Sequence, residues 1–232
     1  MSMVLESQVY WRLLALAQQF PAIAQERLFD WVCALLDGPL NSASLGALTL
    51  ARVQAGALPE MGALDAAGWQ ALLAVLHGQL PDHLDPRPVA PGSSDDALLA
   101  AFASSDGVRI NGHFGACPLF FIYRITPTET RLVDIRRFSA RDADQAGSES
   151  NEQRAQLLDG CHLLFCEAIG GPAAARVIRH GIHPVKVRRD PSLSTQLADL
   201  RQMMDGPLPP WLAKALGRRS DLADRFDLEH EE

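Results

Sequence analysis

The residues best suited to chemistry lie in the segment His113-Phe114-Gly115 and in Cys117, four residues after the histidine. A neutral imidazole binds iron through one nitrogen, and a soft thiolate suits iron–sulfur species. Gly112 and Gly115 lie on either side of His113 and leave room for a bulky ligand. The pattern makes His113 a candidate metal ligand, and Cys117 a second candidate that could face the same pocket if the stretch is a loop. The alternatives are a turn histidine that satisfies local hydrogen bonds and a buried thiol at the start of a strand.

A second candidate site is the turn Gly170-Gly171-Pro172, which lies between an apolar strand and a helix. Backbone N–H groups at a helix N-terminus attract anions, and proline is favoured in the first helical turn. We therefore predict that Gly170 and Gly171 form a cradle for an anionic ligand. The alternative is a plain tight strand-to-helix connection, which would use glycine as well.

The remaining cysteines and histidines are less suited to a binding site. Cys161 and Cys166 are five residues apart, and such a separation on a strand places side chains on opposite faces unless Cys161 precedes the strand. We expect at most one of them near a site. For His162, too, packing in the core is the favoured role. A cation at a helix C-terminus interacts well with the helix dipole, which explains His180 without a metal.

An enzyme is the less favoured hypothesis. Asp106, Asp134 and Glu167 lie at or near predicted strands, and a cluster of such carboxylates around divalent metal is typical of nucleases with a ribonuclease H-like sheet. Their separations fit no compact motif, however. The chain also has no GxSxG, HExxH, P-loop or CxxC pattern. We therefore predict that the protein is not an enzyme.

The bulk composition favours a globular protein that neither binds nucleic acid nor enters a membrane. The 232 residues carry 21 Lys+Arg against 28 Asp+Glu, a formal charge of -7 that repels a phosphate backbone. The first twenty residues lack a positive n-region, and no stretch reaches the roughly 18 apolar residues of a membrane span. The cytoplasm is the expected compartment. The four cysteines fit no disulfide framework and are expected to be reduced.

The apolar periodicity predicts two domains. Residues 1–80 contain helical patterns over 7–20, 23–36, 44–53 and 65–76, typical of a small all-α bundle. Asp65 is the expected N-cap of the last of these. Residues 81–96 are rich in proline and aspartate without a periodic apolar face, which indicates a linker.

Residues 97–216 alternate between strand and helix patterns and predict an α/β domain on a mixed, ribonuclease H-like sheet with flanking helices. Residues 118–126 and 131–138 are expected to form a hairpin around the turn TPTE. Residues 217–232 are predicted to be a charged tail. The other expected strands are 97–104, 162–169 and 184–187, and the expected helices are 150–159, 173–180, 192–204 and 211–216.

Taken together, the motifs of this second domain resemble the dinitrogenase iron–molybdenum cofactor family, the NifX/NifY/NafY proteins. The matching segments are SSDG at 104–107, HFG at 113–115, IGGPAAARVI at 169–178, GIHPVKV at 181–187 and PPWLAKAL at 209–216. The helical first domain and linker are similar to the two-domain NifY/NafY members. By that resemblance the first domain would have a sterile-alpha-motif-like fold.

The resemblance implies a non-catalytic carrier of the iron–molybdenum cofactor or its iron–sulfur precursor. The partners it implies are apo-dinitrogenase and other nitrogenase cofactor assembly proteins. In the family the HFG histidine is implicated in cofactor binding, so the expected site comprises His113 with Phe114, Gly115, Cys117 and Gly170–Gly171. The alternative is a pure protein–protein adaptor that stabilises apo-dinitrogenase without holding a cluster.

Overall fold

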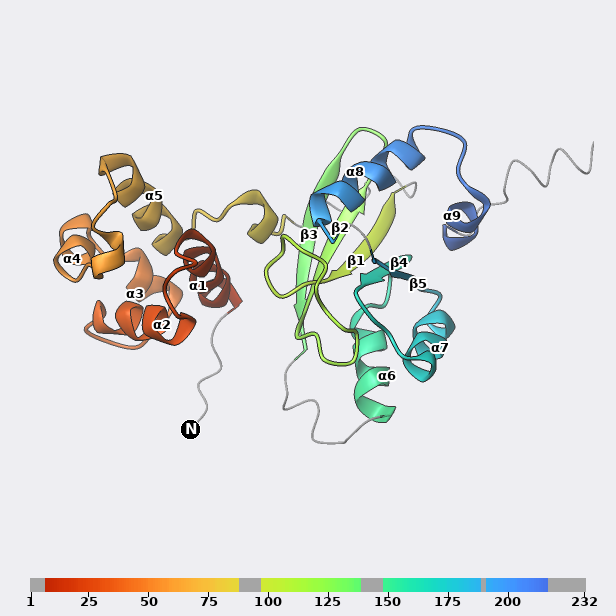
Figure 1. Ribbon diagram of the computed structural model, residues 1–232, viewed down its shortest axis with the longest axis horizontal. Helices are drawn as coiled ribbons and strands as arrows, with labels where there is room; N and C mark the ends of the chain where they lie inside the picture. Colours follow the sequence, from red (N-terminus) through yellow and green to blue (C-terminus); the bar gives the residue numbers. More distant parts are fainter. Residues whose placement is uncertain (1–6, 88–96, 139–147, 189–190, 217–232) are drawn as a thin grey trace, which may run out of the picture. The chain divides into compact units, whose positions relative to one another are not determined.

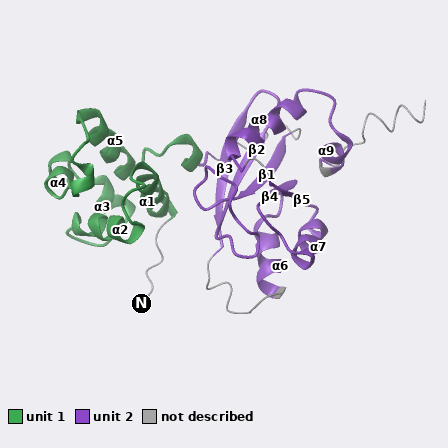
Figure 2. Cartoon of the chain, in the orientation of Figure 1, with its two compact units in different colours: residues 1–85 green, residues 86–232 purple. Residues whose placement is uncertain are grey.

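The computed structural model describes residues 7–87, 97–138, 148–188 and 191–216 (Figure 1). The chain divides into two compact units, residues 1–85 and residues 86–232 (Figure 2). The predicted tail and residues 88–96 of the predicted linker lie outside the described ranges. Within those ranges no helix has the length and apolar character that crossing a bilayer requires.

The first unit is built from short helices around an apolar core. The Asp65 side chain accepts a hydrogen bond from the Gly68 N–H at 2.7 Å, as expected of an N-cap. Leu16, Leu45 and Leu72 are fully buried in the core. The elements are α1 (Ser7–Gln19), α2 (Gln25–Ala34), α3 (Ser42–Gly46), α4 (Leu50–Ala55), the 3-10 helix η1 (Pro59–Met61), α5 (Ala66–Leu76) and the 3-10 helix η2 (Asp82–Leu84).

The prediction of one helix over residues 44–53 is wrong, because two separate caps divide this stretch. Asn41 and Ser44 form a capping box at the start of α3. The Thr49 side chain accepts from the Arg52 N–H and begins α4. Apolar spacing alone does not reveal a new N-cap inside a continuous periodic pattern.

The second unit contains a mixed five-stranded sheet in the order β3-β2-β1-β4-β5, flanked by helices, as predicted (Figure 1). Strands β1 and β2 pair antiparallel, as do β2 and β3, whereas β1, β4 and β5 are parallel. The 126–129 turn closes the predicted hairpin, because the Thr126 N–H donates to the Glu129 carbonyl. The strands are β1 (Leu98–Ala103), β2 (Leu119–Ile125), β3 (Thr130–Arg137), β4 (Leu163–Cys166) and β5 (His183–Lys186).

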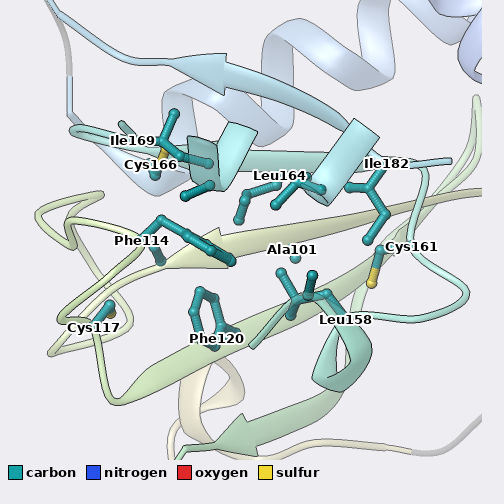
Figure 3. Close-up of a cluster of buried hydrophobic side chains, with 14 of the residues drawn as sticks. Ala101, Phe114, Cys117, Phe120, Leu158, Cys161, Leu164, Cys166, Ile169 and Ile182 are labelled. Carbon is teal, nitrogen blue, oxygen red and sulfur yellow. The ribbon is translucent and has the colours of Figure 1, made fainter. Parts of the chain in front are cut away.

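Helices α6 (Ser148–Leu157) and α7 (Gly171–Arg179) pack on one face of this sheet. Figure 3 shows the buried cluster that they share with β1, β2 and β4, including Ala101, Phe120 and Leu164. Adjacent strand residues point to the opposite face, where Phe102 stacks on Phe165 at 4.9 Å. Helix α8 (Leu193–Met204) contacts β2, and α9 (Pro210–Ala215) follows it.

Candidate functional site

The predicted site residues meet at the carboxyl ends of the parallel strands β1 and β4. In open α/β sheets this edge is where ligands bind, because loops diverge there and helices begin there. A tight turn leaves β1 at this edge, since the Ser104 Oγ accepts from the Gly107 N–H at 2.8 Å. Gly107 adopts a positive φ of 73°, which explains the glycine of the SSDG motif. The turn starts a loop that returns past the end of β4.

The loop returns along the residues that follow β4. The Glu167 N–H donates to the Gly112 carbonyl at 3.0 Å, and the Phe114 N–H donates to the Ala168 carbonyl at 2.9 Å. His113 and Ala168 form a parallel bridge. Two segments more than fifty residues apart in the sequence are thus held side by side, and the register of the histidine is set by backbone hydrogen bonds.

The turn from 113 to 117 separates an exposed imidazole from a buried anchor. The N–H groups of Ala116 and Cys117 both donate to the His113 carbonyl, at 2.9 and 2.8 Å. Phe114 is fully buried, and its ring lies 6.0 Å from that of Phe120 (Figure 3). The His113 side chain is 62% exposed. The HFG motif therefore places its phenylalanine in the core and its histidine in solvent.

Close packing beneath the turn explains Gly112. A Cβ on Gly112 would lie 2.5 Å from the Cys117 Sγ and 2.9 Å from the Ala103 carbonyl carbon, which is closer than real contacts allow. The Cys117 thiol is 3% exposed and donates to the Leu119 carbonyl at 3.1 Å. Burial raises the pKa of this thiol. The structure thus places Cys117 inside the core below His113 rather than beside it on the surface.

Helix α6 supports the same turn from its other side. A Cβ on Gly115 would meet the Asn151 Oδ1 at 3.5 Å, an ordinary contact distance. One turn later on α6, the guanidinium of Arg154 lies 3.7 Å from the Phe138 ring centroid and donates to the Ser150 Oγ. Burial lowers the pKa of Arg154. Sequence reasoning missed this buried arginine, since nothing in the polar pattern of α6 distinguishes it.

The turn into α7 is open, whereas the turn around Gly112 is closely packed. Gly170 is the N-cap, with φ −74° and ψ 153°, and no side chain caps the helix. Nothing lies within 4 Å of a Cβ placed on Gly170 or Gly171, and neither glycine has a positive φ. The backbone and the packing therefore do not require glycine at either position. The turn begins only two residues after Ala168, the partner of His113, so both predicted segments lie at one edge.

A carboxylate stands next to the predicted ligand. The Glu167 Oε2 lies 3.6 Å from the His113 Nε2, and the Glu167 side chain is 52% exposed. Sequence reasoning considered Glu167 only as part of a nuclease cluster and missed this pairing. Its position directly after β4, at the edge that also receives the HFG segment, is the signal that could have found it.

The other two cysteines of this unit lie in the core. Cys161 and Cys166 are both buried in the cluster on the α6–α7 face (Figure 3). Cys161 precedes β4, which is the case in which strand alternation was not expected to separate the two side chains. Burial raises the pKa of each of these thiols to about 11.

Two other histidines of this unit, His162 and His180, have hydrogen-bond partners that explain them. The His162 Nδ1 accepts the Leu99 N–H at 2.9 Å, next to the amino end of β4. The His180 Nε2 lies 2.8 Å from the Glu152 Oε1, and its Nδ1 lies 2.7 Å from the Asp159 Oδ1. Hydrogen bonds to Glu152 and then to Asp159 raise the pKa of His180. It joins the C-terminus of α7 to α6.

The carboxylates of the nuclease alternative do not gather. The Asp106 Oδ1 accepts the Val108 and Arg109 N–H groups, and Asp134 pairs with Arg136 at 3.0 Å. Within the described part of the chain, no group of three or more His, Cys, Asp or Glu side chains could hold a metal ion. Among those residues the arrangement presents His113 as an exposed imidazole beside one carboxylate, not as part of a closed metal cage.

Known proteins match both the motifs and the length of the chain. Residues 96–203 match the family described as dinitrogenase iron-molybdenum cofactor. The chain is 41% identical to protein NifY of Klebsiella pneumoniae over 208 residues, which cover 90% of this chain and 89% of that protein. It is 40% identical to protein NifY of Azotobacter vinelandii over 141 residues, 61% of this chain and 57% of that protein. It is 32% identical to protein NifX of Rhodobacter capsulatus over 149 residues, 62% of this chain and 94% of that protein. The chain therefore belongs to the dinitrogenase iron–molybdenum cofactor family of NifX and NifY proteins.

Proposed function

We propose that this protein binds the iron–molybdenum cofactor of nitrogenase, or its iron–sulfur precursor, and associates with apo-dinitrogenase for insertion of the cofactor. Family membership supports the wider role in biosynthesis of this cofactor. A further relative, 31% identical over 121 residues, is the FeMo cofactor biosynthesis protein NifB of Klebsiella pneumoniae. The cofactor is cargo in this proposal, taken up and released without any chemical change.

One observation carries the proposal: an exposed histidine and an unobstructed helix N-terminus lie at the same edge of the sheet. The bridge to Ala168 holds His113 two residues from the start of the Gly170–Gly171 turn. Neither the backbone conformation nor the packing requires glycine at these two positions. The absence of side chains there leaves space for a large ligand. The first N–H groups of α7 point outward without a side-chain cap and favour negative charge.

The single protruding imidazole suits a carrier. A complete iron–sulfur cluster satisfies most of its own metal coordination, so one reversible protein ligand is enough to hold it. In this proposal His113 binds the cluster, while Gly115, Gly170 and Gly171 lie against it. Phe114 and Cys117 contribute indirectly, because their buried side chains anchor the turn that carries His113. Transfer follows because the acceptor enzyme offers more ligands than the carrier does.

The first unit is proposed to dock the apo-enzyme, with residues 81–96 as the linker to a cofactor-binding domain at 97–216. Within that predicted linker, Asp82–Leu84 form η2 and belong to the first unit. An open pocket of about 400 Å³ between α2, α3 and α4 supports a docking role. Leu35, Leu36 and Leu48 line this pocket together with the ion pair of Arg52 and Asp37. Other cofactor assembly proteins are further proposed partners. We also propose the cytoplasm as its compartment. Its acidic composition supports the proposal that it has no nucleic-acid partner.

The strand order supports a ribonuclease H-like fold for the second unit. Strand β2 runs antiparallel to both neighbours, while β1, β4 and β5 are parallel, in the order β3-β2-β1-β4-β5. We propose this fold as the scaffold of a binding protein rather than of a nuclease. A sterile-alpha-motif-like fold is proposed for the first unit by family resemblance.

Anaerobic titration with isolated iron–molybdenum cofactor, followed by gel filtration and iron counting, tests the carrier role. Wild type should retain iron, and His113→Ala should lose most of it. His183→Ala is the matched control, because His183 is an exposed histidine at the opposite end of the parallel strands. Equal retention by wild type and His113→Ala would remove His113 as the principal ligand.

The adaptor alternative predicts a different result in the same titration. Neither protein would retain iron, while metal-free protein would still co-elute with apo-dinitrogenase. Binding to the apo-enzyme that is unaffected by His113→Ala, together with no cofactor uptake, would replace the carrier proposal by the adaptor.

A further inference from the structure

We propose that Glu167 positions His113 by accepting the Nε2–H of the imidazole, so that Nδ1 is the nitrogen that binds the metal of the cargo. This inference deepens the proposed function and rests on it. It assigns Glu167 as a positioning residue that acts through the ligand and does not bind the cluster itself.

The backbone sets the two side chains next to each other. Glu167 donates its N–H to the carbonyl of Gly112, the residue directly before His113. The next residue, Ala168, accepts the N–H of Phe114, directly after His113. Hydrogen bonds on both sides of the histidine therefore hold it in register with the carboxylate.

The remaining gap lies between two exposed side-chain ends. The His113 Nε2 and Glu167 Oε2 are 3.6 Å apart, slightly beyond a hydrogen bond. Both side chains are more than half exposed, so rotation about their own bonds closes the gap without disturbing the core. The turn beneath them is anchored by the buried side chains of Phe114 and Cys117.

A carboxylate at one ring nitrogen determines what the other can do. When a histidine donates one N–H to a carboxylate, its second nitrogen carries the lone pair and becomes a more basic ligand. Because Glu167 approaches Nε2, it favours the Nε2–H tautomer and leaves Nδ1 for the metal. The same arrangement orients the ring before the cargo arrives, which reduces the ordering needed on binding.

The negative charge of Glu167 also bears on selectivity. A simple anion that binds only through charge is repelled by this carboxylate, whereas a cluster with an open metal site gains a stronger imidazole ligand. The start of α7, three to four residues after Glu167, provides partial positive charge for the anionic parts of the cargo. The pairing thus favours a metallocluster over free phosphate or sulfate.

The first test needs no cargo. Two-bond ¹H–¹⁵N correlation spectra of histidine-labelled protein at pH 8.5 report the tautomer of each ring, and His113→Gln identifies the His113 signal. We expect the Nε2–H form in wild type and a shift toward Nδ1–H in Glu167→Gln, because the amide can donate to Nε2. Glu129→Gln, at the exposed hairpin turn, is the matched control. An unchanged His113 signal in Glu167→Gln would overturn the inference.

The second test is the anaerobic titration with isolated iron–molybdenum cofactor. Loss of a carboxylate partner behind a metal-binding histidine typically weakens binding about 10–100-fold, so Glu167→Gln should fall in that range and Glu129→Gln should bind as wild type does. If His113→Ala loses iron but Glu167→Gln keeps full affinity, this inference fails and the carrier proposal stands. If His113→Ala binds the cofactor as tightly as wild type, His113 is not the ligand that the carrier proposal requires, and this inference fails as well.

Discussion

Two glycine-containing turns meet at the carboxyl edge of the sheet, and they use glycine for opposite reasons. At Gly112 a Cβ would lie 2.5 Å from the Cys117 Sγ, so the absence of a side chain is a condition of folding. At Gly170 and Gly171 nothing lies within 4 Å of a Cβ, so the fold does not require glycine. The comparison separates a residue that builds the site from residues that keep it open. It also predicts that stability and cofactor binding respond separately to substitution.

Gly112→Ala should have the largest effect, because the added methyl group has no space. Overpacking a close-packed interior costs about 1–3 kcal/mol, and urea unfolding of the purified variant would measure it. Gly115→Ala is the control in the same turn, since its Cβ meets only the Asn151 Oδ1 at 3.5 Å. If both variants unfold at the urea concentration of wild type, the turn around Gly112 is looser than the packing indicates.

Gly171→Leu should leave the fold intact and weaken cofactor retention. A side chain at this position points into open space, so the free energy of unfolding should change by no more than about 0.5 kcal/mol. Iron retained after anaerobic gel filtration should fall, because the leucine occupies the space proposed for the cargo. Ala175→Leu, at an exposed position further along α7, should keep full retention. Normal retention by Gly171→Leu would show that the open turn is not part of the binding surface.

Cys117→Ala distinguishes packing from ligation below the histidine. Removing a buried thiol that donates to the Leu119 carbonyl should cost about 1 kcal/mol of stability, in the usual range for a core substitution. Cofactor retention should stay close to that of wild type, because the thiol does not reach the surface that carries His113. A loss of iron as complete as that of His113→Ala would instead make Cys117 a ligand.

The smallest expected effect is a pH dependence of stability at the C-terminal end of α7, which His180 joins to α6. Its pKa is raised above 6.5, so the stabilisation it provides is present below pH 6.5 and is lost as pH rises through the raised value. The hydrogen bond from His180 lowers the pKa of Glu152, so that contribution is lost only as pH falls through the lowered value. Urea unfolding between pH 5 and pH 9 should show the decline. Arg176 and Arg179 also face Glu152.

His180→Gln is the control for that titration. The variant should lose the decline of stability above pH 6.5, because the glutamine has no charge to lose. An equal decline in wild type and in the variant would assign the pH dependence to other groups.

The class of the fold could be predicted from the sequence because periodicity is a local property. Apolar alternation and the TPTE turn located β2 and β3, and Asp65 marked the start of α5. The division of residues 44–53 into α3 and α4 was missed, since the Thr49 cap lies within a continuous apolar pattern. Whether Cys161 precedes its strand was left open by the sequence, and the structure places it before β4.

Residue types and their spacing along the chain identified the candidate groups: an HFG histidine, an IGGP turn, and a motif set typical of one family. Which of these groups share a surface could be learned only from the folded chain. Pairing of β1 with β4 brings Glu167 close to His113, while Cys117 is buried in the core and Gly170 and Gly171 stay open. Strand pairing and close packing act between residues far apart in the chain, and no local pattern records those distances.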